Sequence, residues 1–193
     1  MKTMVLDTST QTLLLAFLDD DKVITKKEIL GNNNHSENLI KTIEAALKEE
    51  NLEVRDFGRI ICGIGPGRYT GLRVSLTVAK VFAWTLNIPL YTISSLDIIA
   101  SGYFKTDGEY IIKTKAKKDH VYYKQIRVED QKITTIIEDR FATDDDFLRV
   151  IKQVFKVIDE ENICFAPENI INERLEKVTD INGLEPNYLR SEL

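Results

Sequence analysis

The alternation of apolar and polar residues predicts a first region that begins with short strands and continues into helices. Strands at 4–6, 12–18 and 23–30 are separated by short polar turns, which favours an antiparallel meander. Between 37 and 49, apolar residues recur at spacings of three and four, which indicates an amphipathic helix with Ser36 as its N-cap.

Residues 58–86 predict the centre of this region, with a buried strand at 60–64, a glycine-rich turn and a long helix. Thr70 is the expected N-cap, so that the helix opens near Gly71 and stops before Asn87. Apolar residues cover roughly 220° of this helix, about twice what one buried face needs. We therefore expect the helix to pack on its own sheet and on a second helix, of this chain or of another protein.

The rest of the chain repeats this plan in shorter form. A strand at 90–93 and a short helix, which opens with a capping-box-like 94–97 and ends at Gly102, give the order β-β-β-α-β-α-β-α. The polar stretch 105–108 predicts a boundary. After it we expect strands at 110–114, 121–128 and 132–137, and then a helix that is capped by Thr143 with Asp146 and runs through Phe155. A strand at 162–166 follows, and 170–178 could form either helix or loop.

This pattern predicts two lobes that share a duplicated plan. We place the first at 1–104 and a shortened second at 105–193, with the tail 185–193 packing back on the first.

The composition is that of an ordinary soluble globular protein. The chain has 193 residues, 43% hydrophobic and 30% charged, and a net charge of −5 that argues against nucleic acid wrapping around a basic surface but allows a local basic patch. Cys62 and Cys164 form no CxxC pair and are expected to be buried free thiols. Neither a signal peptide nor a membrane span is visible, so we expect a cytoplasmic protein.

The glycine turn is the first candidate for chemistry. A strand that leads through Gly65 and Gly67 into a helix N-terminus is a common phosphate cradle, but neither GxxxxGK[ST] nor GxSxG is present. Asp7, at the end of the first strand, either faces a phosphate or metal or accepts hydrogen bonds from its own turn, and we favour the turn. Asp7, Thr8, Gly65, Gly67 and Arg68 therefore form a candidate remnant nucleotide or phosphate site, in which close packing is the favoured role of the glycines.

Other polar residues allow two interpretations each. His35 and His120 are far apart in sequence and do not make the three or four ligands of a metal site, so no metal is expected. Arg68 and Arg73 either hold a phosphate or carboxylate or are solvated. The lysines at 113, 115, 117 and 118 either contact nucleic-acid phosphates or protect a sheet edge, and edge protection is favoured.

Several of these segments together resemble the TsaB (YeaZ) family, which is needed to make threonylcarbamoyladenosine in transfer RNA. The resemblance covers 1–97 strongly, resumes weakly near 121 and returns at the tail. It is carried by Asp7-Thr8-Ser9-Thr10, by His35-Ser36-Glu37 with Leu39, by Gly65-Pro66-Gly67-Arg68-Tyr69-Thr70-Gly71-Leu72-Arg73, and by Glu185-Pro186 with Tyr188-Leu189-Arg190. The chain departs from the family pattern at Lys115-Ala116-Lys117, where an Asp-Ala-Arg-like stretch is usual, and in its short second lobe.

The resemblance implies an ASKHA fold (actin-like ATPase or sugar-kinase-like) and a non-catalytic scaffold subunit. The implied partners are a catalytic paralogue, TsaD, and an ATPase, TsaE, with self-association when the chain is alone and tRNA reached only through the complex. It implies no intrinsic cofactor, with ATP or ADP confined to the assembled complex. The rival functions are an ATP-dependent phosphotransferase of the same fold and a metallopeptidase-like hydrolase, which the missing phosphate lysine and the absence of HExxH oppose.

The helix pattern also predicts where a partner would bind. Residues on one side of the central helix must pack on the sheet, which leaves another apolar stripe near the surface. We expect this stripe and the preceding helix to form the partner-binding seam, with the residues Leu39, Ile43, Val74, Val78, Val81 and Trp84.

Overall fold

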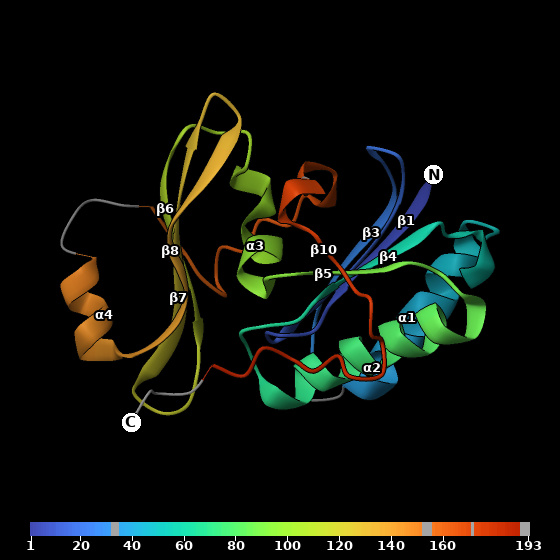
Figure 1. The fold of residues 1–193 in the computed structure, drawn as a ribbon, viewed down its shortest axis with the longest axis horizontal. Coiled ribbons are helices and arrows are strands. Elements are labelled where there is room, and N and C mark those ends of the chain that lie inside the picture. Colours follow the sequence, from blue (N-terminus) through green and yellow to red (C-terminus); the bar gives the residue numbers. More distant parts are fainter. Residues whose placement is uncertain (32–34, 152–155, 171, 190–193) are drawn as a thin grey trace.

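The computed structural model describes residues 1–31, 35–151, 156–170 and 172–189, and it contains two β-sheets with helices on both sides of the first (Figure 1). The six-stranded sheet has the order β10-β5-β4-β1-β2-β3. Its strands are β1 (Lys2–Asp7), β2 (Thr12–Asp19), β3 (Lys22–Leu30), β4 (Arg59–Gly63), β5 (Leu90–Ile93) and β10 (Glu176–Lys177). The first three form the predicted antiparallel meander, whereas β4 runs parallel to both β1 and β5.

Two long helices, α1 (His35–Glu49) and α2 (Tyr69–Leu86), lie side by side on one face of this sheet (Figure 1). Both begin slightly earlier than predicted. The N-cap of α2 is Arg68, whose carbonyl accepts the first helical bond from Leu72, so Thr70 lies inside the helix. Ser36 likewise lies within α1. Asn87 ends α2 in the left-handed conformation, which agrees with the predicted stop.

The opposite face of the first sheet carries α3 (Ser95–Ala100), the 3-10 turn η2 (Ser101–Tyr103) and then the second sheet. That sheet has the order β8-β7-β6-β9, with β6 (Gly108–Lys115), β7 (His120–Glu129), β8 (Lys132–Thr143) and β9 (Lys156–Ile158). The short helix α4 (Asp144–Val150) covers its outer face, and Thr143 caps that helix as predicted. One continuous apolar core joins α3 to both sheets.

The second lobe differs from prediction in two places. The strand expected at 162–166 is wrong, because the Cys164 amide donates to the Ile99 carbonyl and the Cys164 carbonyl accepts from the Gly102 amide, both in the first lobe. The strand that completes the second sheet beside β6, on the side away from β7, is β9. The helix expected to reach Phe155 ends at Val150, and 152–155 fall outside the described residues.

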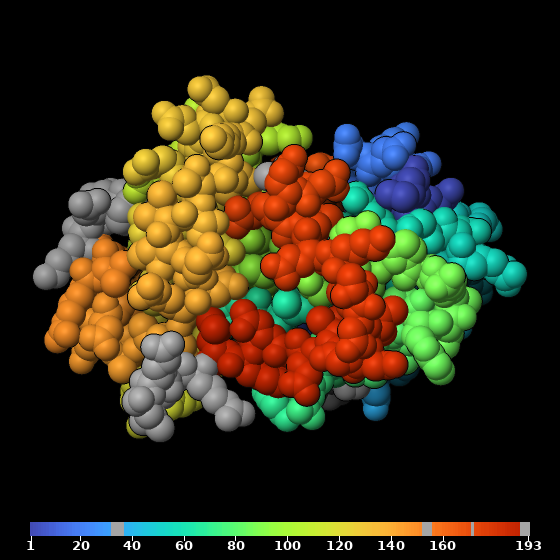
Figure 2. Space-filling model, in the orientation of Figure 1, coloured from blue at the N-terminus to red at the C-terminus, as the bar shows by residue number. Residues whose placement is uncertain are grey.

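The C-terminal segment returns to the first lobe earlier than residue 185. After the turns η3 (Pro167–Asn169) and η4 (Asn172–Arg174), β10 pairs antiparallel with β5, a short strand that the expected helix or loop at 170–178 did not include. The chain then crosses α2, where Lys80 donates hydrogen bonds to the carbonyls of Asn182 and Leu184. Figure 2 shows this segment, in red, running across the front of the molecule onto α2.

The remaining short turn is η1 (Val54–Asp56), which precedes β4. Both cysteines are free: Cys62 is fully buried, which raises the pKa of its thiol, whereas Cys164 is only partly buried, contrary to prediction. Among the described helices, none has the length and apolar character needed to cross a bilayer.

Candidate functional site

The structure brings the predicted remnant phosphate site together, and its polar groups bond to one another. The carboxylate of Asp7 is fully buried at the end of β1. It accepts hydrogen bonds from the amide of Ser9 at 2.8 Å, the hydroxyl of Ser9 at 2.6 Å and the hydroxyl of Ser95 at 2.5 Å. The amide of Gly65 in turn donates to the Ser95 hydroxyl at 2.9 Å. Asp7 therefore connects its own turn to the start of α3.

The glycines of the turn allow α2 to approach the strand-end turn closely. A Cβ at Gly71 would stand 1.8 Å from the carbonyl oxygen of Thr8, and one at Gly67 would stand 2.6 Å from that of Ser9. The amide of Arg68 donates to the Ser9 carbonyl at 2.7 Å, and the Thr8 hydroxyl donates to the Gly71 carbonyl at 2.6 Å. The turn amide and carbonyl thus form hydrogen bonds with residues of this chain, whereas in other folds such turn amides bind phosphate. This supports the interpretation that the glycines serve close packing.

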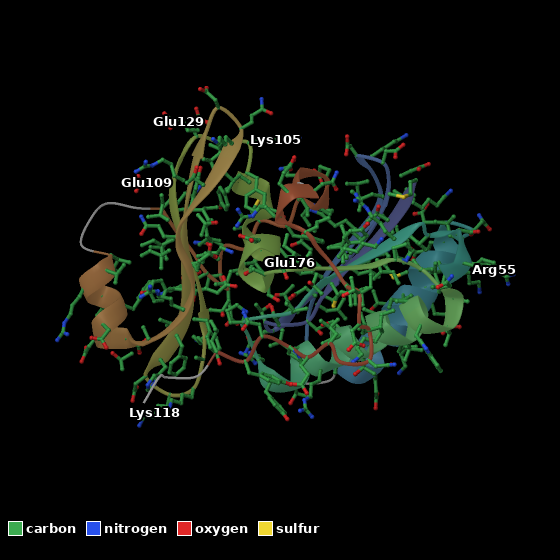
Figure 3. All side chains as sticks on the ribbon, viewed as in Figure 1. Arg55, Lys105, Glu109, Lys118, Glu129 and Glu176 are labelled. Carbon is green, nitrogen blue, oxygen red and sulfur yellow. The ribbon has the colours of Figure 1, made fainter. Side chains whose placement is uncertain are left out.

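A cavity of about 550 Å³ lies between the lobes, where β5 and α3 face β7, β8 and the C-terminal segment. Figure 3 shows Glu176, which belongs to the edge strand β10 and lines this cavity, near the middle of the view. Among the described residues that line the cavity, two are basic, Lys124 and Arg174, and six are acidic: Asp97, Glu138, Asp139, Glu173, Glu176 and Glu185. Such a surface repels the phosphates of a nucleotide.

The floor of this cavity is a buried ion network that joins three parts of the fold. Arg174 of η4 donates to both carboxylate oxygens of Asp97 at 2.7 Å, and Lys124 of β7 donates to Asp97 at 3.0 Å. Lys124 also lies 3.5 Å from Asp139 of β8, which accepts a hydrogen bond from Ser94. The network therefore links α3 of the first lobe to the second sheet and to the C-terminal segment.

Sequence reasoning treated Asp97 as part of a helix cap and did not single out its partners. The hydroxyl of Ser94 bonds to Asp139 rather than to the α3 backbone, so the expected capping box is absent. One signal was available: in strand alternation Lys124 shares a face with the apolar Ile126 and Val128, and a charge on an apolar strand face indicates a buried ion pair.

The network makes a pH dependence predictable. Burial raises the pKa of Asp139, and the nearby Asp97 carboxylate adds to this rise, while Lys124 and Ser94 oppose it. A carboxyl whose folded-state pKa exceeds its unfolded value costs stability as it ionises, so this cost appears as pH rises above about 4. We expect Asp139→Asn to gain stability relative to wild type between pH 3.5 and 7. Urea unfolding at several pH values measures the difference, and a relative loss on raising the pH would contradict the assignment.

A second surface is apolar and lies on α1 and α2. Val81 and Trp84 of α2 are 50% and 71% exposed, and Ile40 of α1 is 47% exposed. Val74 and Val78 are half-buried against the core, and their spacing of four and then three to Val81 puts all three on one helix face. We call the set Ile40, Val74, Val78, Val81 and Trp84 the α1–α2 face.

Leu39 and Ile43 do not belong to this face, contrary to the predicted seam. Both are buried in the core that α1 shares with the first sheet. These two residues of α1 thus pack within the chain, whereas Ile40 of the same helix is exposed.

The remaining candidates are dispersed. In the second lobe, the His120 ring stacks on Phe141 and its Nδ1 lies 2.7 Å from the Lys118 carbonyl. The side chain of His35 lies outside the described residues. Within the described ranges, no cluster of three or more His, Cys, Asp or Glu could hold a metal ion.

Two lobes, each built on a sheet, with a strand-end Asp and a glycine turn at their junction, define the ASKHA fold class. Two solved structures from Pseudomonas aeruginosa share this fold. One, described as an uncharacterized protein with similarity to peptidase YeaZ, covers 98% of this chain and 99% of its own at a TM-score of 0.82 and 19% identity. The other, YeaZ, covers 87% of this chain and 88% of its own at a TM-score of 0.74 and 18% identity.

Sequence comparison identifies the family. The model of TsaD, tRNA N6-adenosine threonylcarbamoyltransferase, matches residues 29–182. The tRNA threonylcarbamoyladenosine biosynthesis protein TsaB of Bacillus subtilis is 29% identical over 153 residues, which is 79% of this chain and 67% of that protein. TsaB of Escherichia coli is 22% identical over 69% of this chain and 58% of its own length. The chain belongs to the family of tRNA N6-adenosine threonylcarbamoyltransferase, TsaD. As the sequence predicted, it resembles the TsaB (YeaZ) proteins. Its matches span about three fifths to two thirds of the length of these two relatives.

Proposed function

We propose that this chain is a non-catalytic subunit of the machinery that makes threonylcarbamoyladenosine in tRNA, and that it binds a TsaD-like catalytic paralogue. The observation that carries the proposal is the α1–α2 face, where Val81 and Trp84 are exposed next to half-buried valines on a helix already packed on its own sheet. A contiguous apolar surface of this kind is typical of a protein-binding site.

The groups at the lobe junction support a non-catalytic role. Asp7 accepts three hydrogen bonds from Ser9 and Ser95, and the turn amides of Gly65 and Arg68 bond to this chain. Among the charged residues that line the cavity beside them, carboxylates predominate. A phosphotransferase needs the opposite arrangement, with amides and cations that face an open phosphate position.

A TsaD-like paralogue is the occupant we favour for the α1–α2 face. The TsaD family model matches most of this chain, so such a paralogue shares its plan of sheet and helices. Two related lobes can pair through equivalent helices, in the way that isologous surfaces pair in dimers. The same face would support self-association when the paralogue is absent, and a TsaE-like ATPase would complete the complex.

Affinity purification of the tagged chain from its source cell tests the proposal. We expect a TsaD-like protein to co-purify, and we expect the purified chain alone to hydrolyse ATP no faster than buffer. Steady ATP turnover that disappears in Asp7→Ala would contradict the proposal and favour a phosphotransferase.

A further inference from the structure

A groove of about 300 Å³ lies where the N-terminus of α2, the β6–β7 hairpin and the C-terminal segment meet. Its polar lining comes from cations and aromatic rings: Arg68, Tyr69, Lys115, Lys117, Tyr122 and Tyr188. We call this the basic groove. The chain as a whole has a net charge of −5, and acids outnumber cations among the charged residues that line the larger inter-lobe cavity. The basic groove therefore differs in charge from both.

The cations of the groove are largely unpaired. Within the described ranges, Lys115 and Lys117 of the groove, and Lys118 beside it in the same hairpin, are exposed and form no salt bridge. The Lys117 Nζ lies 5.4 Å from the centroid of the Phe141 ring. Figure 3 shows Lys118 at the outer end of the β6–β7 hairpin. Acidic residues lie on the other side of the hairpin: Glu160 is 3.7 Å from Arg68, and a neighbouring cavity is lined by the same lysines together with Asp119, Asp144, Asp159, Glu160 and Glu161. The described lining of the basic groove itself contains cations and no acid.

Edge protection, the favoured sequence-based explanation for these lysines, does not account for all of them. β9 pairs with β6 only at Tyr110–Ile112, so edge protection still applies to Lys113 and Lys115 farther along β6. Lys117 and Lys118 follow the end of β6 and precede β7, so they lie in a turn rather than along a strand edge. Charges in this turn guard no unpaired strand backbone.

The aromatic groups beside these cations are suited to stacking. Tyr69 is 56% exposed, and its ring stacks on Tyr188 with centroids 5.1 Å apart. The guanidinium of Arg73 lies 4.3 Å from the Tyr69 centroid and donates to the Tyr188 hydroxyl at 2.8 Å, which holds the two rings in place. Rigid exposed rings next to free lysines are the combination with which proteins bind single-stranded RNA, because rings stack on bases and lysines neutralise phosphates.

We propose that the basic groove binds an RNA strand directly, with Lys115, Lys117 and Lys118 on the phosphates and Tyr69 against an unstacked base. This inference rests on the proposed function, since tRNA is the RNA that the complex modifies. It makes the chain itself a contributor to tRNA contact, in addition to its binding of the paralogue.

Fluorescence anisotropy of a labelled, unmodified tRNA transcript, titrated with the chain at KCl concentrations from 50 to about 200 mM, tests the proposal. Reversing both hairpin charges, in Lys117→Glu with Lys118→Glu, is expected to weaken binding at least about tenfold at 50 mM KCl. The slope of log affinity against log salt should fall by roughly 0.7 for each lost phosphate contact. Tyr69→Ala is expected to weaken binding about fivefold or more and to leave that slope unchanged.

The matched control reverses two exposed lysines elsewhere, in Lys22→Glu with Lys132→Glu, which changes the net charge equally. We expect this control to bind tRNA almost as wild type does. Wild-type affinity and slope in the hairpin variant would overturn the proposal, as would equal losses in hairpin variant and control. Polyglutamate that competes as well as tRNA at equal charge would also overturn it, because the groove would then be a site for acidic protein.

The same variants separate this inference from the proposed function. The hairpin variant should still bind the TsaD-like paralogue, whereas Val81→Glu should lose the paralogue and keep tRNA. If wild type binds tRNA but no paralogue, the proposed function fails alone; if it binds the paralogue but no tRNA at 50 mM KCl, the basic groove fails alone.

Discussion

Replacing Asp97 with Ala is expected to destabilise the protein by about 3–5 kcal/mol, the usual cost of breaking a buried charge network from one side. The substitution leaves Lys124 and Arg174 without the carboxylate that both contact, at 3.0 and 2.7 Å. Side-chain exposures of 5% for Lys124 and 11% for Arg174 mean that water cannot readily replace it. Because the network joins both lobes and the C-terminal segment, the loss should appear in the global unfolding transition.

Urea unfolding of wild type and Asp97→Ala measures this loss, and Glu37→Ala provides the matched control. Glu37 lies 3.9 Å from Lys41 in an exposed pair on α1, so its removal is expected to cost no more than about 0.5 kcal/mol. A loss below about 1 kcal/mol in Asp97→Ala would mean that the network does not hold the lobes together.

Replacing Val81 with Glu is expected to weaken binding of the TsaD-like paralogue at least about 30-fold, or ~2 kcal/mol, as at an interface hot spot. A carboxylate there would be buried without a partner in the complex, whereas in the free chain it stays in water because Val81 is half exposed. Trp84→Ala should also weaken binding, since exposed Trp residues are frequent hot spots. Isothermal titration calorimetry with the paralogue gives both affinities.

The control for Val81→Glu is Ile136→Glu, which places the same charge at an apolar residue 44% exposed on β8 of the second lobe. We expect that control to bind as wild type. Circular dichroism of each variant verifies the fold. A folded Val81→Glu variant with wild-type affinity would mean that the paralogue binds elsewhere.

Most of the first lobe could be predicted from sequence because its signals are local. The three strands of the meander, the glycine turn and α2 depend on alternation, turn residues and helical spacing, and each lies where the pattern placed it. The apolar excess on α2 also predicted that Val81 and Trp84 would be near the surface. Leu39 and Ile43 were misplaced because the pattern of α1 shows which residues are apolar but not which of them pack into the core that α1 shares with the first sheet.

The second lobe and the ion network depend on contacts that no local pattern reports. β9 has three residues, too few for a period, and it is defined by its pairing with β6. The apolar run 162–166 resembles a strand, yet Cys164 bonds to the first lobe. Arg174 lies 77 positions from Asp97, in a stretch whose pattern suggested helix or loop equally, so their pairing could be found only from the structure.

Reconstituted threonylcarbamoyl transfer to a tRNA transcript tests the central claim most directly. The rate of threonylcarbamoyladenosine formation would be measured with the TsaD-like paralogue alone, with this chain alone, with both, and with the paralogue plus Val81→Glu, with the TsaE-like ATPase and threonylcarbamoyl-adenylate present throughout. We predict product only when the paralogue and the wild-type chain are together, and almost none with Val81→Glu. Product formed by this chain alone, or at the wild-type rate with Val81→Glu, would contradict the account.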